Sequence, residues 1–217
     1  MADFTVIFKS LAPLATAGFG ACDASTVAEW AAVQDRFPNR DVTALTAIRQ
    51  LEHWCIDQSF HALGYSDLRI THTANGKPEA IGNPAIHLSI AHHSMVDGCW
   101  AAVALGEGAI GVDVEAERRQ LQRIAPRFLS LAEQEVVGES LAALAGAWAV
   151  KECMFKAFGP ALDFRRDLQV KWRGLEHAEE AGVIGSVRGS ERHYRIVPMQ
   201  MSLSEAPMWL ALGPTSN

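Results

Sequence analysis

Apolar and polar residues alternate at residues 110–115, which read Ile-Gly-Val-Asp-Val-Glu. A period of two is typical of a β-strand, where successive side chains point to opposite faces of the sheet. The pattern therefore predicts a strand that directs Asp113 and Glu115 from one face, while the apolar residues beside them face the core.

A helical period follows at residues 139–158, and Gly159-Pro160 is expected to end this predicted helix. Trp148, Glu152 and Lys156 stand four residues apart within it. Residues at this spacing lie in one row along a helix, so an acid and a base are expected on the same face.

Other segments follow one of these two periods. Residues 41–64 predict a long helix, because apolar residues recur at helical spacing and Gly64 supplies a stop. Ser25 and Thr26, with Glu29, predict an earlier helix start, and an arginine-rich helix is predicted at about 117–125, ended by Pro126. Strands are predicted at residues 4–9, 67–72, 85–91, 99–105, 168–172, 193–197 and 207–212, with turns at 75–78 and 106–109.

The order of these elements is strand, helices, strands, and then strands, helices, strands. This order predicts an α+β fold with two similar lobes that meet near residue 107, namely an N-terminal lobe at 1–107 and a C-terminal lobe at 108–217. Each lobe is expected to be a small antiparallel sheet packed on a long helix, as in a pseudodimer.

Composition limits the classes of function. The net charge is -6, which argues against a general nucleic-acid binder. The longest apolar run is much shorter than the ~20 residues of a membrane helix, and the N-terminus lacks the pattern of a secretory signal. The four cysteines show no zinc-ligand spacing, so we expect a cytoplasmic protein with reduced cysteines.

One glycine pattern invites a different interpretation. Residues 106–111 match the G-x-G-x-x-G motif of dinucleotide-binding folds, and they follow a predicted strand. That motif must open a helix whose N-terminus receives the pyrophosphate. Here the next residues alternate as a strand, so we reject the dinucleotide interpretation.

The two opening motifs together offer three carboxylates and a lysine. Mg²⁺ prefers oxygen ligands and is commonly held by a few carboxylates and substrate phosphates, which makes Asp113, Glu115 and Glu152 candidate ligands. Lys156 is then a candidate phosphate contact. The alternative for Glu152 and Lys156 is an ordinary helical salt bridge worth ~0.2–0.5 kcal/mol.

These motifs, at this separation, resemble the signature of 4'-phosphopantetheinyl transferases of the surfactin-synthetase-activating (Sfp) type. Gly76-Lys77-Pro78 matches the G-K-P turn of that family, and residues 90–93 resemble its I-S-H-S segment. Residues 127–130 with Glu133 resemble its R-F-F-S-x-x-E stretch. One departure is Ala91, which stands where the family has a serine, so Ser89 or Ser94 is a candidate replacement.

The resemblance implies a role for each matching residue. Asp113, Glu115 and Glu152 would bind Mg²⁺, while Lys156 would contact the phosphates of coenzyme A. Lys77 and His92 would contact those phosphates as well, and Thr46 falls near a family position that contacts coenzyme A.

The implied reaction moves phosphopantetheine from coenzyme A to a serine of an acyl or peptidyl carrier protein. Adenosine 3',5'-bisphosphate leaves, and Glu152 accepts the serine proton, directly or through a water. The alternative is a non-catalytic carrier-binding or coenzyme A-binding subunit of the same fold. The length of the chain, by the same resemblance, implies a monomer.

Arginines follow the metal-binding motif in the sequence. Arg118, Arg119 and Arg123, with Arg127, are candidates for a basic face that attracts an acidic carrier protein. The alternative is that these arginines pair with Glu115, Glu117 or Glu133.

Overall fold

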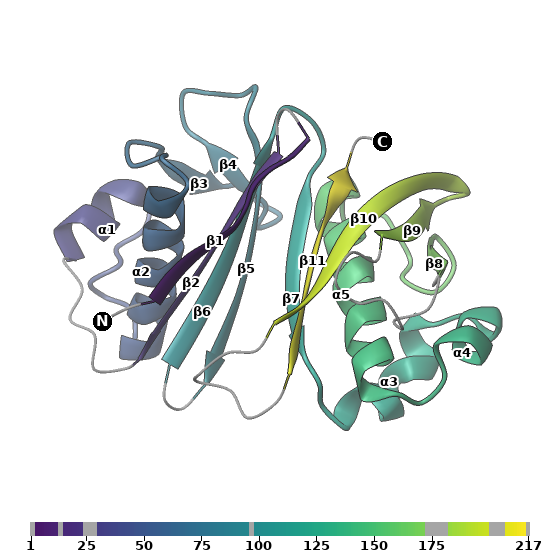
Figure 1. Ribbon diagram of the computed structural model, residues 1–217. Coiled ribbons are helices and arrows are strands. Elements are labelled where there is room, and N and C mark those ends of the chain that lie inside the picture. Colours follow the sequence, from purple (N-terminus) through teal and green to yellow (C-terminus); the bar gives the residue numbers. More distant parts are fainter. Residues whose placement is uncertain are drawn as a thin grey trace. The chain divides into compact units, whose positions relative to one another are not determined.

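The computed structural model describes residues 3–12, 15–23, 30–95, 98–171, 182–199 and 207–215. Its internal contacts divide the chain into two compact units, the first unit at residues 1–108 and the second unit at 109–217. Both units combine helices with antiparallel sheets, which confirms the predicted α+β class (Figure 1). The symmetry of a pseudodimer, and the functions predicted for the lobes, stay predictions.

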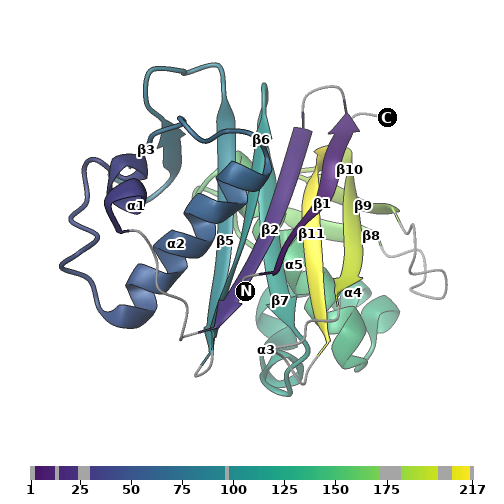
Figure 2. The ribbon, with the colours of Figure 1, turned by 60° about the vertical axis from the view of Figure 1, so that its left-hand side comes forward.

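The first unit contains a four-stranded antiparallel sheet in the order β1-β2-β6-β5 and a separate hairpin, β3-β4. Figure 2 shows the long helix α2 crossing the face of the four-stranded sheet. The elements are β1 (Asp3–Ala12), β2 (Ala15–Asp23), α1 (Trp30–Arg36), α2 (Ala47–Ala62), β3 (Ile70–His72), β4 (Pro78–Ala80), β5 (His87–Met95) and β6 (Gly98–Gly106).

Helix α2 begins six residues later than the sequence predicts, at Ala47. The Asp41 carboxylate accepts hydrogen bonds from the backbone N–H groups of Thr43 and Ala44, which holds this segment in a turn. The helix then buries Leu51, Cys55 and Phe60 against apolar residues of β6. These apolar contacts fix which face of α2 lies on the sheet.

Strand β5 is longer than predicted and includes His92, His93 and Ser94. The sequence places these residues in a segment between two strands, whereas they pair with β6 along its length, for example His92 opposite Ala101. The predicted strand therefore continues, and alternation sends His92 and Ser94 from the same face.

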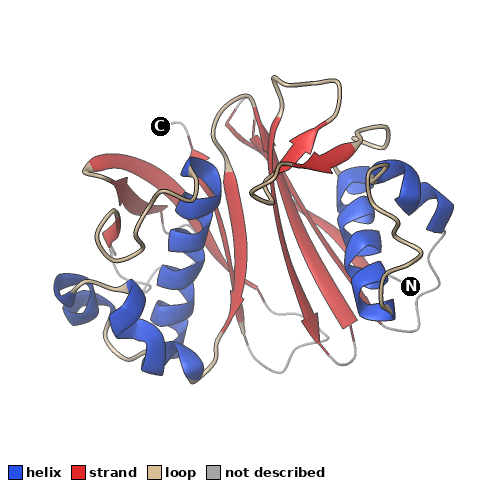
Figure 3. Cartoon of the chain, turned by 180° about the vertical axis from the view of Figure 1, so that it is seen from behind, coloured by secondary structure: helices blue, strands red, loops and turns tan. Residues whose placement is uncertain are grey.

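The second unit contains a five-stranded antiparallel sheet in the order β7-β11-β10-β9-β8. Figure 3 shows, for this unit taken by itself, that its helices lie on one side of its sheet. The elements are β7 (Gly111–Ala116), α3 (Gln120–Phe128), α4 (Leu131–Val137), α5 (Leu141–Phe158), β8 (Leu168–Lys171), β9 (Gly182–Val187), β10 (Ser190–Met199) and β11 (Met208–Thr215).

Helix α5 confirms the predicted helix and its stop. Ser140 caps its start by accepting a hydrogen bond from the Ala143 N–H, and Gly159 ends it with a φ of 100°. Almost every residue from Ala143 to Met154 is buried, because the sheet lies on one side of α5 and α3 and α4 lie beside it. This burial makes α5 the central element of the second unit.

Helix α3 differs from its prediction at both ends, since it starts at Gln120 and continues through Pro126. Leu121, Ala125 and Phe128 bury one face of this helix, while Pro126 lies on the exposed face. Packing of the buried face therefore outweighs the one backbone hydrogen bond that proline cannot donate.

Three other points complete the comparison with the sequence. Strands β2, β4 and β9 and helix α4 were not predicted, and the predicted helix start at Ser25, Thr26 and Glu29 lies outside the described residues. The predicted turn at 106–109 is confirmed: strand β7, and no helix, follows the glycine pattern. In the part of the chain that the structure describes, no helix has the length and apolar character needed to cross a bilayer.

Candidate functional site

A glycine brings β7 and α5 into unusually close contact. A Cβ atom added at Gly111 would lie 1.9 Å from the carbonyl oxygen of Cys153, a distance that no side chain allows. The Cys153 thiol donates to the Gly111 carbonyl oxygen at 3.0 Å, which joins the same two elements. The glycine of the alternating motif therefore lets the helix approach the strand that carries the carboxylates.

Asp113 and Lys156 meet across this contact. The Lys156 Nζ lies 2.7 Å from Asp113 Oδ1 and also donates to the Val112 carbonyl oxygen at 3.1 Å. Asp113 is buried, whereas the Lys156 side chain is 27% exposed. The ammonium group can therefore exchange its carboxylate partner for an incoming anion.

The side chains that face α5 are those of the odd-numbered residues of β7. Gly111 touches Cys153, Asp113 binds Lys156, and Glu115 is buried. The sequence predicts the acids on one face and the apolar residues toward the core. The shared face of the acids is correct, and Ile110 and Val112 are buried as predicted. The side of β7 that α5 covers, however, is the acidic one, so Val112 is not part of the core around α5.

Glu115 is held by an arginine. The Arg118 guanidinium donates to both carboxylate oxygens of Glu115, at 2.8 and 3.1 Å. Burial raises the pKa of Glu115, and the charge of Asp113 adds to this effect while Arg118 opposes it. Of the alternatives for the arginines, the pairing with Glu115 is therefore realised for Arg118.

Glu152 has a different environment, although it lies one helical turn from Lys156. Its carboxylate forms no hydrogen bond or ion pair with any described residue, so the ordinary helical salt bridge with Lys156 is not formed. Burial raises its pKa to about 7, and the negative charge of Asp113 contributes next. Burial and the neighbouring acid thus disfavour the charged form of Glu152.

The donor set suits a hard divalent cation. Three carboxylates with a charge surplus are the oxygen ligands that Mg²⁺ accepts, and a cation would relieve the repulsion among them. Within the described residues, no group of three or more His, Cys, Asp or Glu side chains is arranged to hold a metal ion. The donor chemistry fits Mg²⁺, whereas Asp113 and Glu115 are engaged with Lys156 and Arg118.

The other lysine of the α5 motif, Lys151, is fully buried. Its ammonium group lies 2.9 Å from the Glu133 carboxylate and donates to the carbonyl oxygens of Phe128, Phe164 and Leu168 at 2.7–2.9 Å. Burial lowers the pKa of Lys151, and Glu133 opposes this shift. These contacts join α5 to α3, α4 and β8.

Glu133 explains the R-F-L-S-x-x-E stretch. Besides binding Lys151, its carboxylate accepts from the backbone N–H of Ser130 at 2.8 Å and of Val170 at 2.8 Å. The Ser130 hydroxyl in turn accepts from the Glu133 N–H, which completes a capping box. This stretch therefore anchors the helix that carries Glu152 and Lys156 through the Lys151 ion pair. Among the described residues, Glu133 pairs with this lysine and with no arginine.

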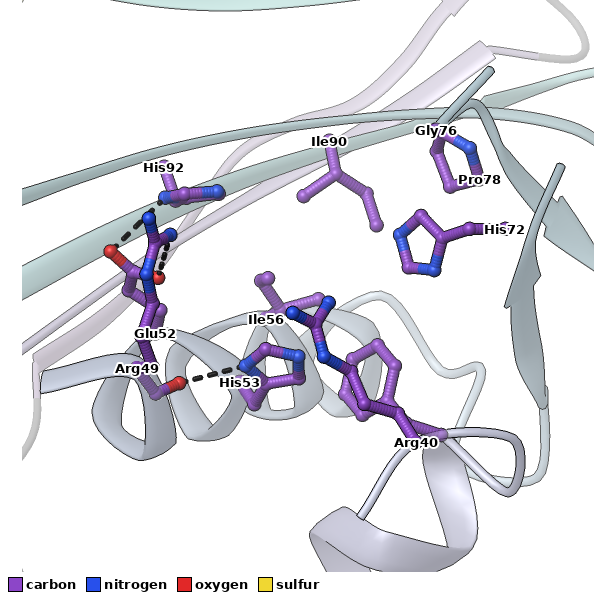
Figure 4. Close-up of a pocket in the computed structure, with 11 residues that line it drawn as sticks. Arg40, Arg49, Glu52, His53, Ile56, His72, Gly76, Pro78, Ile90 and His92 are labelled. Atoms are coloured by element: carbon purple, nitrogen blue, oxygen red, sulfur yellow. Dashed lines mark hydrogen bonds and ion pairs between the residues drawn. The ribbon is translucent and has the colours of Figure 1, made fainter. Parts of the chain in front are cut away.

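A second cluster of charged residues lies in the first unit, around a pocket of about 160 Å³. Figure 4 shows Arg49, Glu52 and His53 on α2, facing His92 on β5 and His72 on β3. The remaining lining residues are Phe37, Arg40, Ile56, Gly76, Pro78 and Ile90.

Arg40 differs from the other arginine of this pocket, Arg49, which pairs with Glu52. Arg40 has no carboxylate within 4.0 Å among the described residues, and its charge acts on both His53 and His72. Burial lowers the pKa of His53 and of His72, and the Arg40 charge lowers both further. At neutral pH these imidazoles are therefore uncharged donors and acceptors beside a guanidinium group.

The pocket includes only one of the three residues predicted to contact coenzyme A. His92 lines it, whereas Lys77 is an exposed turn residue whose two neighbours, Gly76 and Pro78, line it. Thr46, the N-cap of α2, is exposed and does not line it. Ser94 shares the face of His92 and donates a hydrogen bond to Glu52.

Sequence reasoning missed most of this pocket. One face of α2 carries polar residues at the helical spacing that also marks its buried residues, namely Arg49, Glu52, His53 and Ile56. This spacing is the signal that could have revealed the α2 side of the pocket. His72 gave no comparable signal, because only the β3-β4 hairpin brings it opposite α2.

The second unit is thus an α+β domain in which carboxylates of an edge strand meet an acid and a lysine of the central helix. Residues 109–197 match the family model of the 4'-phosphopantetheinyl transferase superfamily. This match covers most of the second unit, and it contains Asp113, Glu115, Glu152 and Lys156. No curated protein matches the chain closely enough to count as a relative.

Proposed function

We propose that the protein transfers the 4'-phosphopantetheine group of coenzyme A to a serine of an acyl or peptidyl carrier protein, in a Mg²⁺-dependent reaction. The observation that carries this proposal is the superfamily match at 109–197, within which β7 and α5 bring the acids and Lys156 together. The transferase superfamily supports the class of reaction, and the charged side chains supply groups suited to a phosphate substrate.

In the reaction, the serine oxygen attacks the β-phosphorus of coenzyme A. The bond from this phosphorus to the bridging oxygen breaks, and adenosine 3',5'-bisphosphate leaves with the electron pair. The proton of the serine hydroxyl goes to Glu152, directly or through a water. Atoms and charges balance without a further reactant.

Asp113, Glu115 and Glu152 would hold Mg²⁺, which when bound neutralises charge on the pyrophosphate. Lys156 would leave Asp113 and bind a phosphate oxygen, where its charge stabilises the leaving side. The buried environment of Asp113 and Glu115 strengthens these charge interactions by excluding water.

The first unit is proposed to bind the other phosphate of coenzyme A, the 3'-phosphate on the ribose. Arg40 and the imidazoles of His53, His72 and His92 offer donors for a phosphate group. Lys77, beside the pocket, would add a flexible cation, and Thr46 stays a candidate contact. The pocket is smaller than the ~300 Å³ of a typical ligand site, so it suits one group of a larger ligand.

The carrier protein is proposed to dock on the exposed arginines that follow β7. Arg119 and Arg123 are exposed, while Arg118 adds a charge that Glu115 partly neutralises. Carrier proteins present acidic helices, so a local basic surface would attract them despite the net charge of the chain. We propose that the enzyme acts as a monomer.

The test is incubation with coenzyme A, Mg²⁺ and an apo-carrier protein, followed by the intact mass of the carrier. We expect a mass gain of one phosphopantetheine, and no gain when a chelator removes the metal. Tight binding of coenzyme A or of the carrier without any mass gain would favour the non-catalytic alternative, and no binding of either would exclude both.

A further inference from the structure

The pocket of the first unit contains an acid as well as cations. Glu52 is 5% exposed and lies on the wall that α2 contributes. Its carboxylate accepts from Arg49 at 2.7 Å and from the Ser94 hydroxyl, and it lies 3.5 Å from His92 Nδ1. A pocket built only to hold a phosphate would not need this acid.

The cations of the pocket differ in whether they already have a carboxylate partner. Arg49 and His92 already have one, whereas Arg40 has none among the described residues (Figure 4). An incoming phosphate therefore finds one available guanidinium group. To engage Arg49 or His92 it must compete with a carboxylate that buried hydrogen bonds hold in place.

The effect of this acid depends on the charge of the ligand. A phosphate monoester carries nearly two negative charges at neutral pH, and a fixed carboxylate in a partly buried pocket repels them strongly. A ribose hydroxyl carries no charge and can donate a hydrogen bond to the same carboxylate. Glu52 thus disfavours the phosphate-bearing ligand relative to one with a free hydroxyl.

We infer that Glu52 is a specificity-determining counter-anion, which weakens the hold of this pocket on a ribose 3'-phosphate. The inference rests on the proposed function, because it takes coenzyme A as the source of that phosphate. In turnover, Glu52 keeps adenosine 3',5'-bisphosphate from binding too tightly after transfer and so promotes its release. The same acid narrows the difference in affinity between ligands with and without the 3'-phosphate.

The test compares two ligands on matched proteins by calorimetric titration. The ligands are adenosine 3',5'-bisphosphate and adenosine 5'-monophosphate, which differ only in the 3'-phosphate. The first variant is Glu52→Gln, which removes the charge and keeps the shape. The second variant, Glu52→Leu, also removes the charge and serves as the alternative if the glutamine side chain prevents folding. Glu79→Gln, an exposed acid on β4 outside the pocket, controls for the change in net charge.

Both Glu52 variants should raise the affinity for the bisphosphate by roughly 10-fold or more at low salt, and that for the monophosphate by less than about 3-fold. Glu79→Gln should leave the ratio of the two affinities as it is in the unchanged protein. In the transfer assay, Glu52→Gln should lower both KM for coenzyme A and kcat, with stronger inhibition by the bisphosphate.

An unchanged ratio in Glu52→Gln and Glu52→Leu would overturn the inference, and a lower ratio would show instead that Glu52 orients Arg49 and His92 for the phosphate. Either result leaves the proposed function intact, because the bisphosphate still binds. If the unchanged protein binds no bisphosphate at all, the proposed function fails, and this role of Glu52 fails with it.

Discussion

The two units each place a glutamate on a long helix among charged groups, with opposite results. In the first unit Glu52 is the one acid among the described residues that line a pocket of arginines and histidines. In the second unit Glu152 lies near two other acids, Asp113 and Glu115, which already pair with Lys156 and Arg118. Burial acts to raise the pKa of both glutamates. Hydrogen bonds from His92 and Ser94 nevertheless lower that of Glu52 to about 2, whereas Asp113 helps raise that of Glu152 to about 7.

Burial acts in the same direction on both pKa values, so the difference between the two glutamates comes from their neighbours. Glu52 is a permanently charged group whose partners are already in place, so it can only modify the binding of another anion. The Glu152 carboxylate has no partner among the described residues, and its environment disfavours its charged form, so it can accept a cation or a proton. The strongest way to test this contrast is to remove each charge separately.

The largest effect is expected for Glu152→Gln, which keeps the shape and removes the charge. Transfer to the carrier should fall by about 1,000-fold or more, because both a cation ligand and the proton acceptor are lost. The initial rate from the intact mass of the carrier measures this, and Glu135→Gln, an exposed acid on α4, is the matched control. A rate near that of the unchanged protein would remove Glu152 from the mechanism.

The two lysines of α5, Lys151 and Lys156, are expected to differ in whether they support stability or transfer. Lys151→Met should lower the free energy of unfolding by about 3–5 kcal/mol, because Glu133 and three carbonyl oxygens lose a buried partner. Lys156→Met should be less destabilising, at about 1–2 kcal/mol, because its ammonium group is partly exposed although the buried Asp113 loses its partner. It should nevertheless reduce transfer by about 100-fold or more.

Denaturant titrations and transfer rates on the same samples check this pair of variants. Below its unfolding transition, Lys151→Met should transfer at a rate set by its folded fraction. A Lys156→Met protein that is destabilised as strongly as Lys151→Met, or that transfers normally, would contradict the division into a structural and a chemical lysine.

The pH dependence of stability should have opposite signs at the two glutamates in the metal-free protein. The raised pKa of Glu152 makes its charge a penalty that is absent below about pH 4.5, grows as the pH rises, and is complete above about 7. The lowered pKa of Glu52 makes its charge a stabilising contribution that is complete above about pH 4.5 and lost toward pH 2.

At pH 8, Glu152→Gln should therefore stabilise the metal-free protein and Glu52→Gln should destabilise it, each by on the order of 1–3 kcal/mol. Near pH 5 most of the gain from Glu152→Gln should have disappeared, while the loss from Glu52→Gln remains. Thermal unfolding midpoints at the two pH values show the pattern. Shifts of the unfolding midpoint with the same sign for both variants at pH 8 would contradict the opposite effects of charge at Glu52 and Glu152.

The sequence predicted the second cluster better than the first for a physical reason. Asp113 and Glu115, and also Glu152 and Lys156, are close in sequence, and the periods of a strand and a helix place each pair on one face. The α+β class followed from the same periods. Only the close approach at Gly111, however, determines that the acidic face of β7 lies under α5.

The first cluster depends on contacts that periodicity does not encode. His72, Glu52 and His92 come from a hairpin, a helix and a strand that are distant in sequence, so only the folded chain places them around one pocket. The extension of β5 through His92 was missed because polar residues interrupt the apolar run, although backbone pairing with β6 continues. Lys151 reads as a surface lysine in sequence, and its four acceptors come from segments that fold around it.

The smallest effect is expected at the proposed carrier surface, where exposed charges are screened by salt. Reversing Arg119 and Arg123 to Glu should raise the apparent KM for the carrier by about 3- to 10-fold at low ionic strength, with little effect at ~0.5 M salt. Arg118 is left in place because it holds Glu115, so its loss would disturb the acidic cluster as well. Initial rates over a range of carrier concentrations provide the measurement.

A matched control separates a local surface from the net charge of the chain. Arg69→Glu combined with Arg165→Glu changes the net charge by the same amount at two exposed positions outside α3. If both double variants raise the apparent KM for the carrier equally, the attraction is a property of the whole charge distribution. If only the reversal of Arg119 and Arg123 raises this KM, the second unit has a basic docking surface close in sequence to its acidic cluster. The arginines then attract the carrier protein, while the acids bind the metal ion.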